Sequence, residues 1–192
     1  MKKKKLQAKD LVMAGVFTVI YIVLVTILST LLAAVPILFL AAPFIIALFC
    51  APVYMLYITR VPKTGAVMIL ALLTGLSMSM ASIWILVYVL VLGLIAEAVL
   101  YITKHSARGI QISYLIFALD SVGSFLTLFF ARDTFLARCE QYYGAEYVET
   151  IERLTPAWSL IVIALTAVTG AFIGVMIGKK MLNKHFEKAG IV

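Results

Sequence analysis

Between Asp10 and Arg60 the chain carries no charged residue and reads LVMAGVFTVIYIVLVTILSTLLAAVPILFLAAPFIIALFCAPVYMLYIT at residues 11–59. This run is long enough for two membrane crossings of about 20 residues each. Residues 64–96 and 154–178 are likewise uncharged, and 64% of the whole chain is hydrophobic against 13% charged. A mean hydropathy of +1.11 excludes a soluble enzyme, a nucleic-acid-binding module and a disordered chain. We therefore expect an integral protein of a lipid bilayer.

The apolar runs predict an all-α bundle of six transmembrane helices. Charges, prolines and glycines divide the runs into crossings at 11–32, 42–57, 65–80, 83–102, 110–131 and 156–177, of which the third is the shortest. The runs are continuously apolar, whereas the strands of a membrane barrel alternate. The connections leave room for one domain over residues 1–192. The Lys-rich start resembles a signal peptide, but its apolar run is too long, so we expect a retained first helix.

The basic residues predict the orientation of this bundle. With the N-terminus in the cytoplasm, every Lys and Arg falls on the inner side except Arg132, Arg138 and Arg153. Cytoplasmic loops carry an excess of Lys and Arg, and an odd number of crossings would abolish the asymmetry. We therefore expect both termini in the cytoplasm of a multi-pass protein.

Two of the expected outer connections are unusual. Residues 33–41 are apolar and contain Pro36, so we expect this connection to dip into the membrane or to cover a site. Residues 133–155 form the longest connection, and their apolar residues are spaced to give one apolar, aromatic side of a helix. This helix is either a lid over a site or an amphipathic helix that rests on lipid headgroups.

Asp120 lies about ten residues into the expected fifth crossing, where an ionisable group costs at least a few kcal/mol. Ser113, Phe117, Ser124 and Thr127 recur with it at steps of three or four residues, so a mostly polar stripe follows one side of the helix. The stripe either lines a substrate cavity, with Asp120 and Ser124 as contacts, or makes hydrogen bonds between helices.

Aromatic and basic residues near the expected outer surface are further candidates for substrate binding. Trp84, Tyr88 and Trp158 begin two of the crossings, where such side chains serve either as interfacial anchors or as flat surfaces for a ring-containing ligand. Arg132 and Asp133 stand where the fifth crossing ends. Arg132 is either simply solvated or held at the mouth of a cavity, where a guanidinium suits an anionic group.

Other conspicuous residues favour structural roles. Glu97 lies near the cytoplasmic end of the fourth crossing, where we expect it to snorkel or to pair with a nearby Lys or Arg. Gly170, Gly174 and Gly178 recur every fourth residue, which lets another helix approach closely.

A second group of small residues, Ala14, Gly15 and Thr18, lies in the first crossing. It seats either a neighbouring helix of the bundle or a separate protein.

No catalytic constellation is present in the sequence. His105 and His185 form no HExxH motif, Cys50 and Cys139 form no CxxC motif, and there is no phosphate-binding GxxxxGK[ST] loop. We therefore expect no enzyme activity, no metal and no cofactor in this chain. Transport against a gradient would then need ATP hydrolysis by another chain or an ion gradient.

Several motifs resemble those of a known family. They are VPKTGA at 61–66, FARD at 130–133, GAEY at 144–147, LTPAW at 154–158 and the C-terminal GKKMLNKHFEKAGI at 178–191. The chain is similar, over almost its whole length, to the Trep_Strep, or MptD-type, family of S components. These are the substrate-binding membrane subunits of energy-coupling factor (ECF) transporters, a micronutrient-importing branch of the ABC transporters.

The resemblance implies partners as well as a site. An S component of the bacterial plasma membrane captures a small molecule outside, and a transmembrane T subunit with two ATP-binding subunits drives its import. Related S components dock through an Ala-x-x-x-Ala pattern in the first helix, for which Ala14 and Thr18, beside Gly15, are the nearest match. Their outward pocket maps here onto the flanks of Pro36 and onto the candidates for substrate binding, namely Trp84, Tyr88, Asp120, Ser124, Arg132 and Trp158. A mostly apolar, aromatic cavity favours a ring-bearing micronutrient.

Two other functions stay open. A self-sufficient, ion-coupled secondary transporter would use the carboxylates of Asp120 and Glu97. A structural or regulatory membrane protein would use the long outer connection and the glycine ridge to bind a partner helix.

Overall fold

Uninterrupted apolar runs form helices in a bilayer because only a helix satisfies all backbone hydrogen bonds within one segment. The computed structural model describes residues 7–80 and 82–188, and within these residues every regular element is helical. The elements are α1 (Ala8–Ala33), α2 (Pro36–Arg60), α3 (Ala66–Met78), α4 (Ile83–Ile102), α5 (Ala107–Phe117), the short 3₁₀ helix η1 (Ala118–Val122), α6 (Gly123–Phe130), α7 (Arg132–Tyr143), α8 (Ala145–Leu154) and α9 (Ser159–Lys188). The basic run at residues 2–5 and the end of the C-terminal motif, from residue 189, lie outside the described residues.

Five helices in this part of the chain are long and apolar enough to cross a membrane. They are Ala8–Ala33, Pro36–Arg60, Ile83–Ile102, Ala107–Phe130 and Ser159–Leu182. Within the described residues the all-α prediction is thereby confirmed, and five of the six predicted crossings coincide with a helix of sufficient length and apolarity. The third predicted crossing corresponds to α3, which has only 13 residues. Its status as a full crossing stays a prediction, together with the orientation of the bundle.

The apolar connection predicted at residues 33–41 is wrong, because helix α2 already begins at Pro36. Proline is favoured at the first position of a helix, where its missing N–H group would have no partner in any case. Residues 36–41 therefore form the first turns of α2 and do not form a loop that covers a site.

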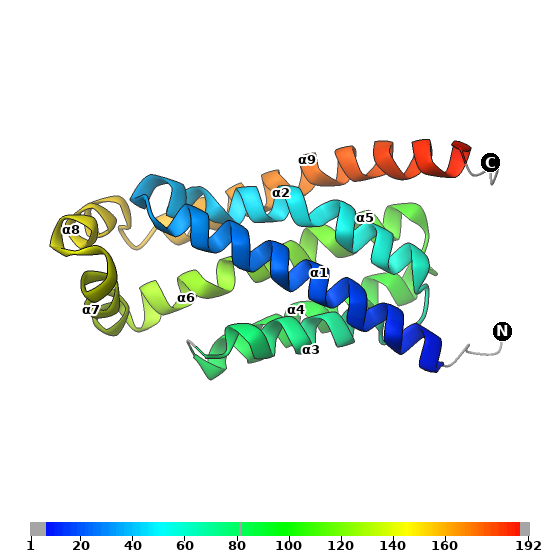
Figure 1. Ribbon diagram of the computed structural model, residues 1–192, viewed down its shortest axis with the longest axis horizontal. Coiled ribbons are helices and arrows are strands. Elements are labelled where there is room, and N and C mark those ends of the chain that lie inside the picture. The colour runs from blue at the N-terminus through cyan, green and yellow to red at the C-terminus, as the bar shows by residue number, and fades with distance from the viewer. Residues whose placement is uncertain (1–6, 81, 189–192) are drawn as a thin grey trace.

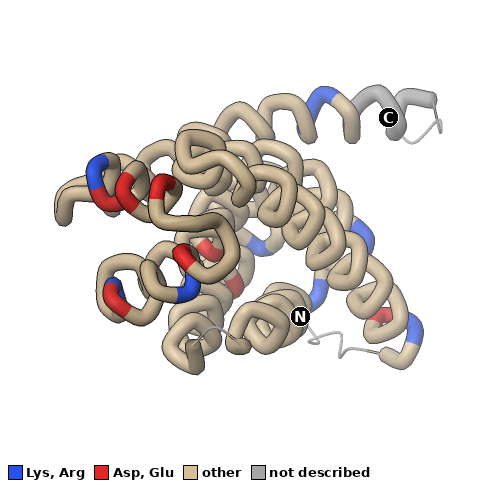
Figure 2. The backbone as a smooth tube through the Cα atoms, turned by 60° about the vertical axis from the view of Figure 1, so that its left-hand side comes forward, with Lys and Arg blue, Asp and Glu red and all other residues tan. Residues whose placement is uncertain are grey.

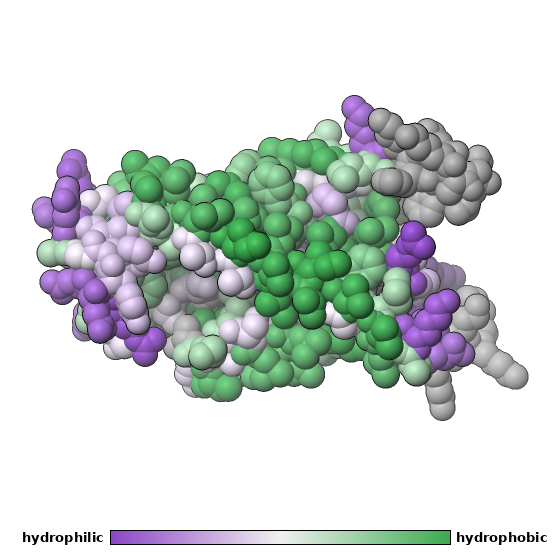
Figure 3. Space-filling view, in the orientation of Figure 1, coloured by the Kyte–Doolittle hydropathy of each residue, from purple (hydrophilic) through white to green (hydrophobic). Residues whose placement is uncertain are grey.

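The start of α1 and the end of α9 lie at one end of the bundle, and α7 and α8 lie across the other end (Figure 1). The acidic and basic residues of α7 and α8 gather there, apart from the basic residues near the start of α1 and the end of α9 (Figure 2). Between the two charged ends, the face of the molecule seen in Figure 3 is mostly apolar. This arrangement is the one expected of a bundle whose middle lies in lipid.

Helix α9 packs against α2 along the predicted glycine ridge. A Cβ atom at Gly170 would lie 2.2 Å from the backbone oxygen of Phe44, and one at Gly174 would lie 2.5 Å from that of Leu48. Real Cβ atoms essentially never come this close. The predicted packing role of these glycines is thus confirmed, because any side chain would force the two helices apart.

Candidate functional site

The long helical span Ala107–Phe130, which corresponds to the fifth predicted crossing, changes its winding at Asp120. Helices α5 and α6 are joined by η1, whose 3₁₀ turns contain Asp120 in the middle of the apolar span. A 3₁₀ stretch within a longer helix often marks a functional hinge or strain. The side chain of Asp120 is 1% exposed, and its Oδ2 accepts a hydrogen bond of 3.0 Å from the Tyr21 hydroxyl of α1. Its second oxygen, Oδ1, is buried without a hydrogen-bond partner.

The other members of the predicted polar stripe divide between the core and a cavity. The hydroxyls of Ser113 and Tyr54 share a hydrogen bond of 2.6 Å, and Ser113 also donates to the backbone oxygen of Ala96 at 3.0 Å. Tyr88 of α4, a substrate candidate outside the stripe, donates to the backbone oxygen of Leu119 at 3.0 Å. Asp120, Ser113 and Tyr88 therefore hold helices together inside the bundle, whereas Ser124 and Thr127 line a cavity.

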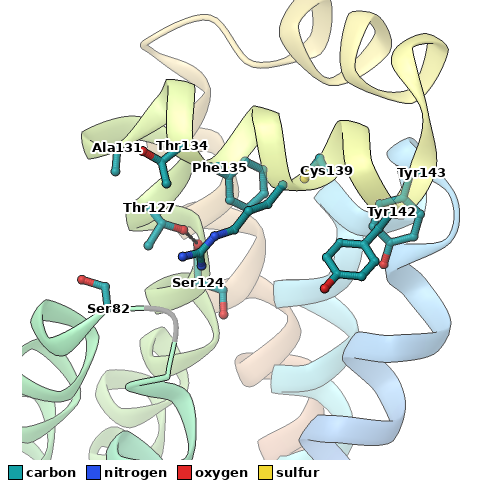
Figure 4. A pocket seen from close by; sticks show the side chains of 10 residues that line it. Ser82, Ser124, Thr127, Ala131, Thr134, Phe135, Cys139, Tyr142 and Tyr143 are labelled. Carbon is teal, nitrogen blue, oxygen red and sulfur yellow. Dashed lines mark hydrogen bonds between the residues drawn. The ribbon is translucent and has the colours of Figure 1, made fainter.

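That cavity, which we call the vestibule, lies between α6 and α7 beside the start of α4. Its volume is about 290 Å³. It is lined by Ser82, Ser124, Thr127, Ala131, Thr134, Phe135, Arg138, Cys139, Tyr142 and Tyr143. Figure 4 shows α7 lying across the vestibule, with Tyr142 projecting from its underside and Ser82 at the opposite side. The position of α7 agrees with the lid interpretation of residues 133–155. We call α7 and α8 together the lid.

A second cavity of about 500 Å³ adjoins the vestibule and shares Ser82, Thr127 and Ala131 with it. Trp84, with 73% of its surface exposed, forms part of its wall. Among the aromatic residues expected to bind substrate, Trp84 thus lies at a cavity. Tyr88 is instead hydrogen-bonded to the backbone of η1. Trp158 is 64% exposed and lies in the turn before α9.

Arg132 holds the lid in place and is not among the residues that line the vestibule. Its guanidinium donates to the backbone oxygen of Thr155 at 3.0 Å and to that of Glu152 at 3.4 Å. These carbonyl groups belong to the C-terminal end of α8, where a cation is favoured by the helix dipole. The guanidinium that lines the vestibule belongs instead to Arg138, further along α7.

Other contacts fix the lid against the bundle. Gly144, with a φ of 87°, makes the sharp turn between α7 and α8. The Tyr147 hydroxyl donates to the backbone oxygen of Ala33 at 2.8 Å, and burial raises the pKa of this phenol. The ring of Phe39 stacks on that of Phe135, with ring centroids 6.1 Å apart. Helices α7 and α8 are therefore built into the fold.

Glu97 has a structural role, although its partners differ from the Lys or Arg that the sequence suggested. Its Oε1 accepts the backbone N–H of Gly65 at 2.7 Å, and its Oε2 accepts that of Val67 at 2.9 Å. The first N–H groups of a helix have no partner within the helix and attract a carboxylate. Glu97 on α4 thus caps the N-terminus of α3.

The small residues of α1 pack within the chain. Ala14 is 0% exposed and Thr18 is 1% exposed, whereas Gly15 is partly exposed. A Cβ atom placed on Gly15 would meet nothing within 4 Å. In this conformation Ala14 and Thr18 contact neighbouring helices of the same bundle, and only Gly15 is open to a partner.

Sequence reasoning missed most of the residues that line the vestibule. The spacing of Phe135, Cys139 and Tyr142 indicates one apolar side of a helix, but not that this side faces a cavity. Arg138 and Ser82 gave no signal, because each is a single polar residue near the expected membrane surface. Within the described residues, no group of three or more His, Cys, Asp or Glu side chains is placed to hold a metal ion.

The comparison with known proteins agrees with the membrane architecture. Residues 8–188 match the family described as "Hypothetical bacterial integral membrane protein (Trep_Strep)". No curated protein and no solved structure matches the chain. Since the match extends from the start of α1 to the end of α9 and includes the lid, the chain belongs to the Trep_Strep family of hypothetical bacterial integral membrane proteins.

Proposed function

We propose that the chain is a substrate-binding subunit of a membrane importer, which captures a small ring-containing solute in the vestibule. The observation that carries this proposal is the vestibule itself, which α7 lies across at the end of the bundle away from the start of α1 and the end of α9 (Figures 1 and 4). Ligand sites are typically concave and mostly apolar, with a few polar groups that orient the ligand.

The chemistry of the lining favours a flat solute with few charges. Phe135, Tyr142 and Tyr143 supply aromatic faces, and Ser82 and Thr127 supply hydroxyl groups. Arg138 contributes the charge of the lining and suits one anionic substituent near the mouth. A sugar, which needs many hydrogen bonds, or a bare metal ion, which needs several carboxylate or imidazole ligands, fits this lining less well.

The proposed mechanism is that of an S component of an ECF transporter. The vestibule faces outward, since the basic residues at the opposite end of the bundle favour the cytoplasmic side. A T subunit and two ATP-binding subunits then supply the energy, and the chain by itself binds solute without hydrolysing ATP. The family resemblance and the lidded cavity support this division of labour.

Native mass spectrometry of the detergent-purified chain tests the binding role. The wild-type chain is expected to retain a small molecule, and Tyr142→Ala is expected to retain at least tenfold less. Tyr142 is 77% exposed, so its removal leaves the core intact. Glu149→Ala, on α8 outside the vestibule lining, is the matched control and should retain as much as wild type. Equal retention by all three proteins would contradict the vestibule as the site.

A second candidate function is ion-coupled transport without partners. It is favoured by Asp120, a buried carboxylate with one oxygen that lacks a hydrogen-bond partner. Uptake of the retained solute from outside vesicles distinguishes the two functions, when vesicles with this chain alone are compared with vesicles that also hold co-purifying ATP-binding subunits. Accumulation by the chain alone under a proton or sodium gradient would support the second candidate, whereas accumulation only in vesicles that also hold the ATP-binding subunits and ATP supports the first.

A further inference from the structure

A cleft between α1 and α3 is lined by hydroxyl groups. It has a volume of about 200 Å³. Its hydroxyl residues are Thr26, Ser29 and Thr30 of α1, Thr74 and Ser77 of α3, and Ser124 of α6. The other lining residues are apolar, and none of the lining residues is charged. We call this cavity the hydroxyl cleft.

The hydroxyl cleft adjoins the vestibule, because Ser124 lines both cavities. In Figure 3 pale, weakly polar residues gather in a hollow between the apolar surfaces of α1 and α3. The two cavities therefore meet at Ser124 of α6.

The hydroxyl residues are arranged to face one another across the cleft. Thr26, Ser29 and Thr30 stand at i, i+3 and i+4 on α1, which places them on one side of that helix. Thr74 and Ser77 stand at i and i+3 on α3. The exposed neighbours on α1 include Val23 and Ile27, so the hydroxyl groups interrupt a surface that is otherwise suited to lipid.

Thr74 provides the observation that points to a ligand. Its side chain is 1% exposed, and its Oγ1 is buried without a hydrogen-bond partner, although it lines the cleft. A buried hydroxyl without a partner is unfavourable, and most such groups in proteins are satisfied. A polar group of a bound solute at this position would supply the missing hydrogen bond.

We propose that the hydroxyl cleft holds the uncharged polar edge of the solute whose ring lies in the vestibule, an inference that rests on the proposed function. Hydroxyl groups both donate and accept, so they suit ring carbonyl, amide and hydroxyl groups. They cannot compensate a full charge in apolar surroundings. The substrate class is therefore a flat heterocycle with neutral hydrogen-bonding groups along one edge, and any anionic substituent stays near Arg138.

The test compares Thr74→Val with wild type by native mass spectrometry of the full chain. Valine has nearly the shape of threonine and removes only the hydroxyl that lacks a partner. We expect at least tenfold less retained solute, with a thermal stability of the emptied protein that is unchanged or higher. A purely structural role for Thr74 would lower that stability instead. Thr169→Val is the matched control, because Thr169 is exposed on α9 and bonded to the backbone oxygen of Leu165.

The remaining outcomes separate the two proposals. If Tyr142→Ala loses the solute and Thr74→Val retains it fully, the hydroxyl cleft is overturned and the vestibule stands. The cleft proposal is also overturned if the retained molecule is a phospholipid or a detergent. The same holds if it carries a charge on the edge that binds next to Thr74. If the wild-type chain retains no molecule at all, the proposed function fails and the cleft proposal fails with it.

Discussion

Tyr21 and Asp120 lie 99 residues apart in sequence and are joined by a buried hydrogen bond of 3.0 Å between α1 and η1. Tyr21→Phe removes the donor and leaves the carboxylate unsatisfied, which we expect to cost about 1–3 kcal/mol. Thermal unfolding in detergent measures this loss. Tyr142→Phe, at an exposed tyrosine, should unfold as wild type does. Equal stability of both variants would show that the bond contributes nothing.

The cap that Glu97 places on α3 gives a local prediction. Glu97→Gln replaces one acceptor oxygen by an NH₂ group, which faces a backbone N–H, so we expect a loss of about 1–2 kcal/mol. Hydrogen exchange should accelerate at the amides of Gly65 and Val67, while the amides in the middle of α4 stay protected. Glu140→Gln, on the lid surface, serves as the control. Unchanged exchange at both amides would contradict the capping role.

The glycine ridge of α9 predicts a sharp difference between glycines. Gly170→Ala and Gly174→Ala place a methyl group on the backbone of α2, and we expect a loss of about 1–3 kcal/mol or failure to fold. Gly15→Ala meets nothing within 4 Å and should be tolerated. Yield of folded monomer and thermal unfolding in detergent provide the readout. Comparable losses at Gly15 and Gly174 would argue against the close approach of α9 and α2.

The hydrogen bonds between Arg132 and the C-terminal end of α8 predict how the lid is held; we call this contact the clamp. Arg132→Gln shortens the side chain and removes both hydrogen bonds to the carbonyl groups of Glu152 and Thr155. We expect faster hydrogen exchange throughout α8 and faster release of the retained solute. Arg153→Gln is a charge-matched control on the lid. Solute release at the wild-type rate would mean that the clamp does not govern opening.

Cys139 reports on the vestibule through its reactivity. Burial raises the pKa of this thiol above its ordinary value of 9.0. The nucleophile is the thiolate, so alkylation by a maleimide should be slow at neutral pH and should still increase with pH above 9. Solute in the vestibule should slow the reaction further. A rate that levels off below pH 9 would contradict the buried environment of Cys139.

Much of the fold was predictable because lipid simplifies the physics. Long uncharged runs determine helices, and Gly170, Gly174 and Gly178 signal close packing through their spacing alone. The start of α2 was not predictable in this way. Pro36 reads as a breaker between two apolar runs, and only the structure shows that it occupies the first turn of a helix.

The site was less predictable, because the rotation of each helix about its axis decides which of its side chains line a cavity. Asp120 and Ser124 belong to one stripe in the sequence, yet Asp120 is buried against Tyr21 and Ser124 lines the vestibule. Asp120 lies in the 3₁₀ turns of η1, and the chain returns to α-helical winding at Gly123, before Ser124. The hydroxyl cleft combines residues from α1, α3 and α6, and Ser or Thr on a single helix gives no sign of such convergence, since these side chains often bond to their own helix.

If α3 crosses the bilayer as predicted, its 13 residues also affect the surrounding lipid. At about 1.5 Å per residue the helix rises about 20 Å, which is about 10 Å less than the hydrocarbon thickness. A short span is accommodated by local thinning of the bilayer. Headgroups and interfacial water would then be drawn down beside α3, toward Ser77. A solute dissolved in the headgroup layer would then enter the hydroxyl cleft laterally, between α1 and α3, from within the membrane.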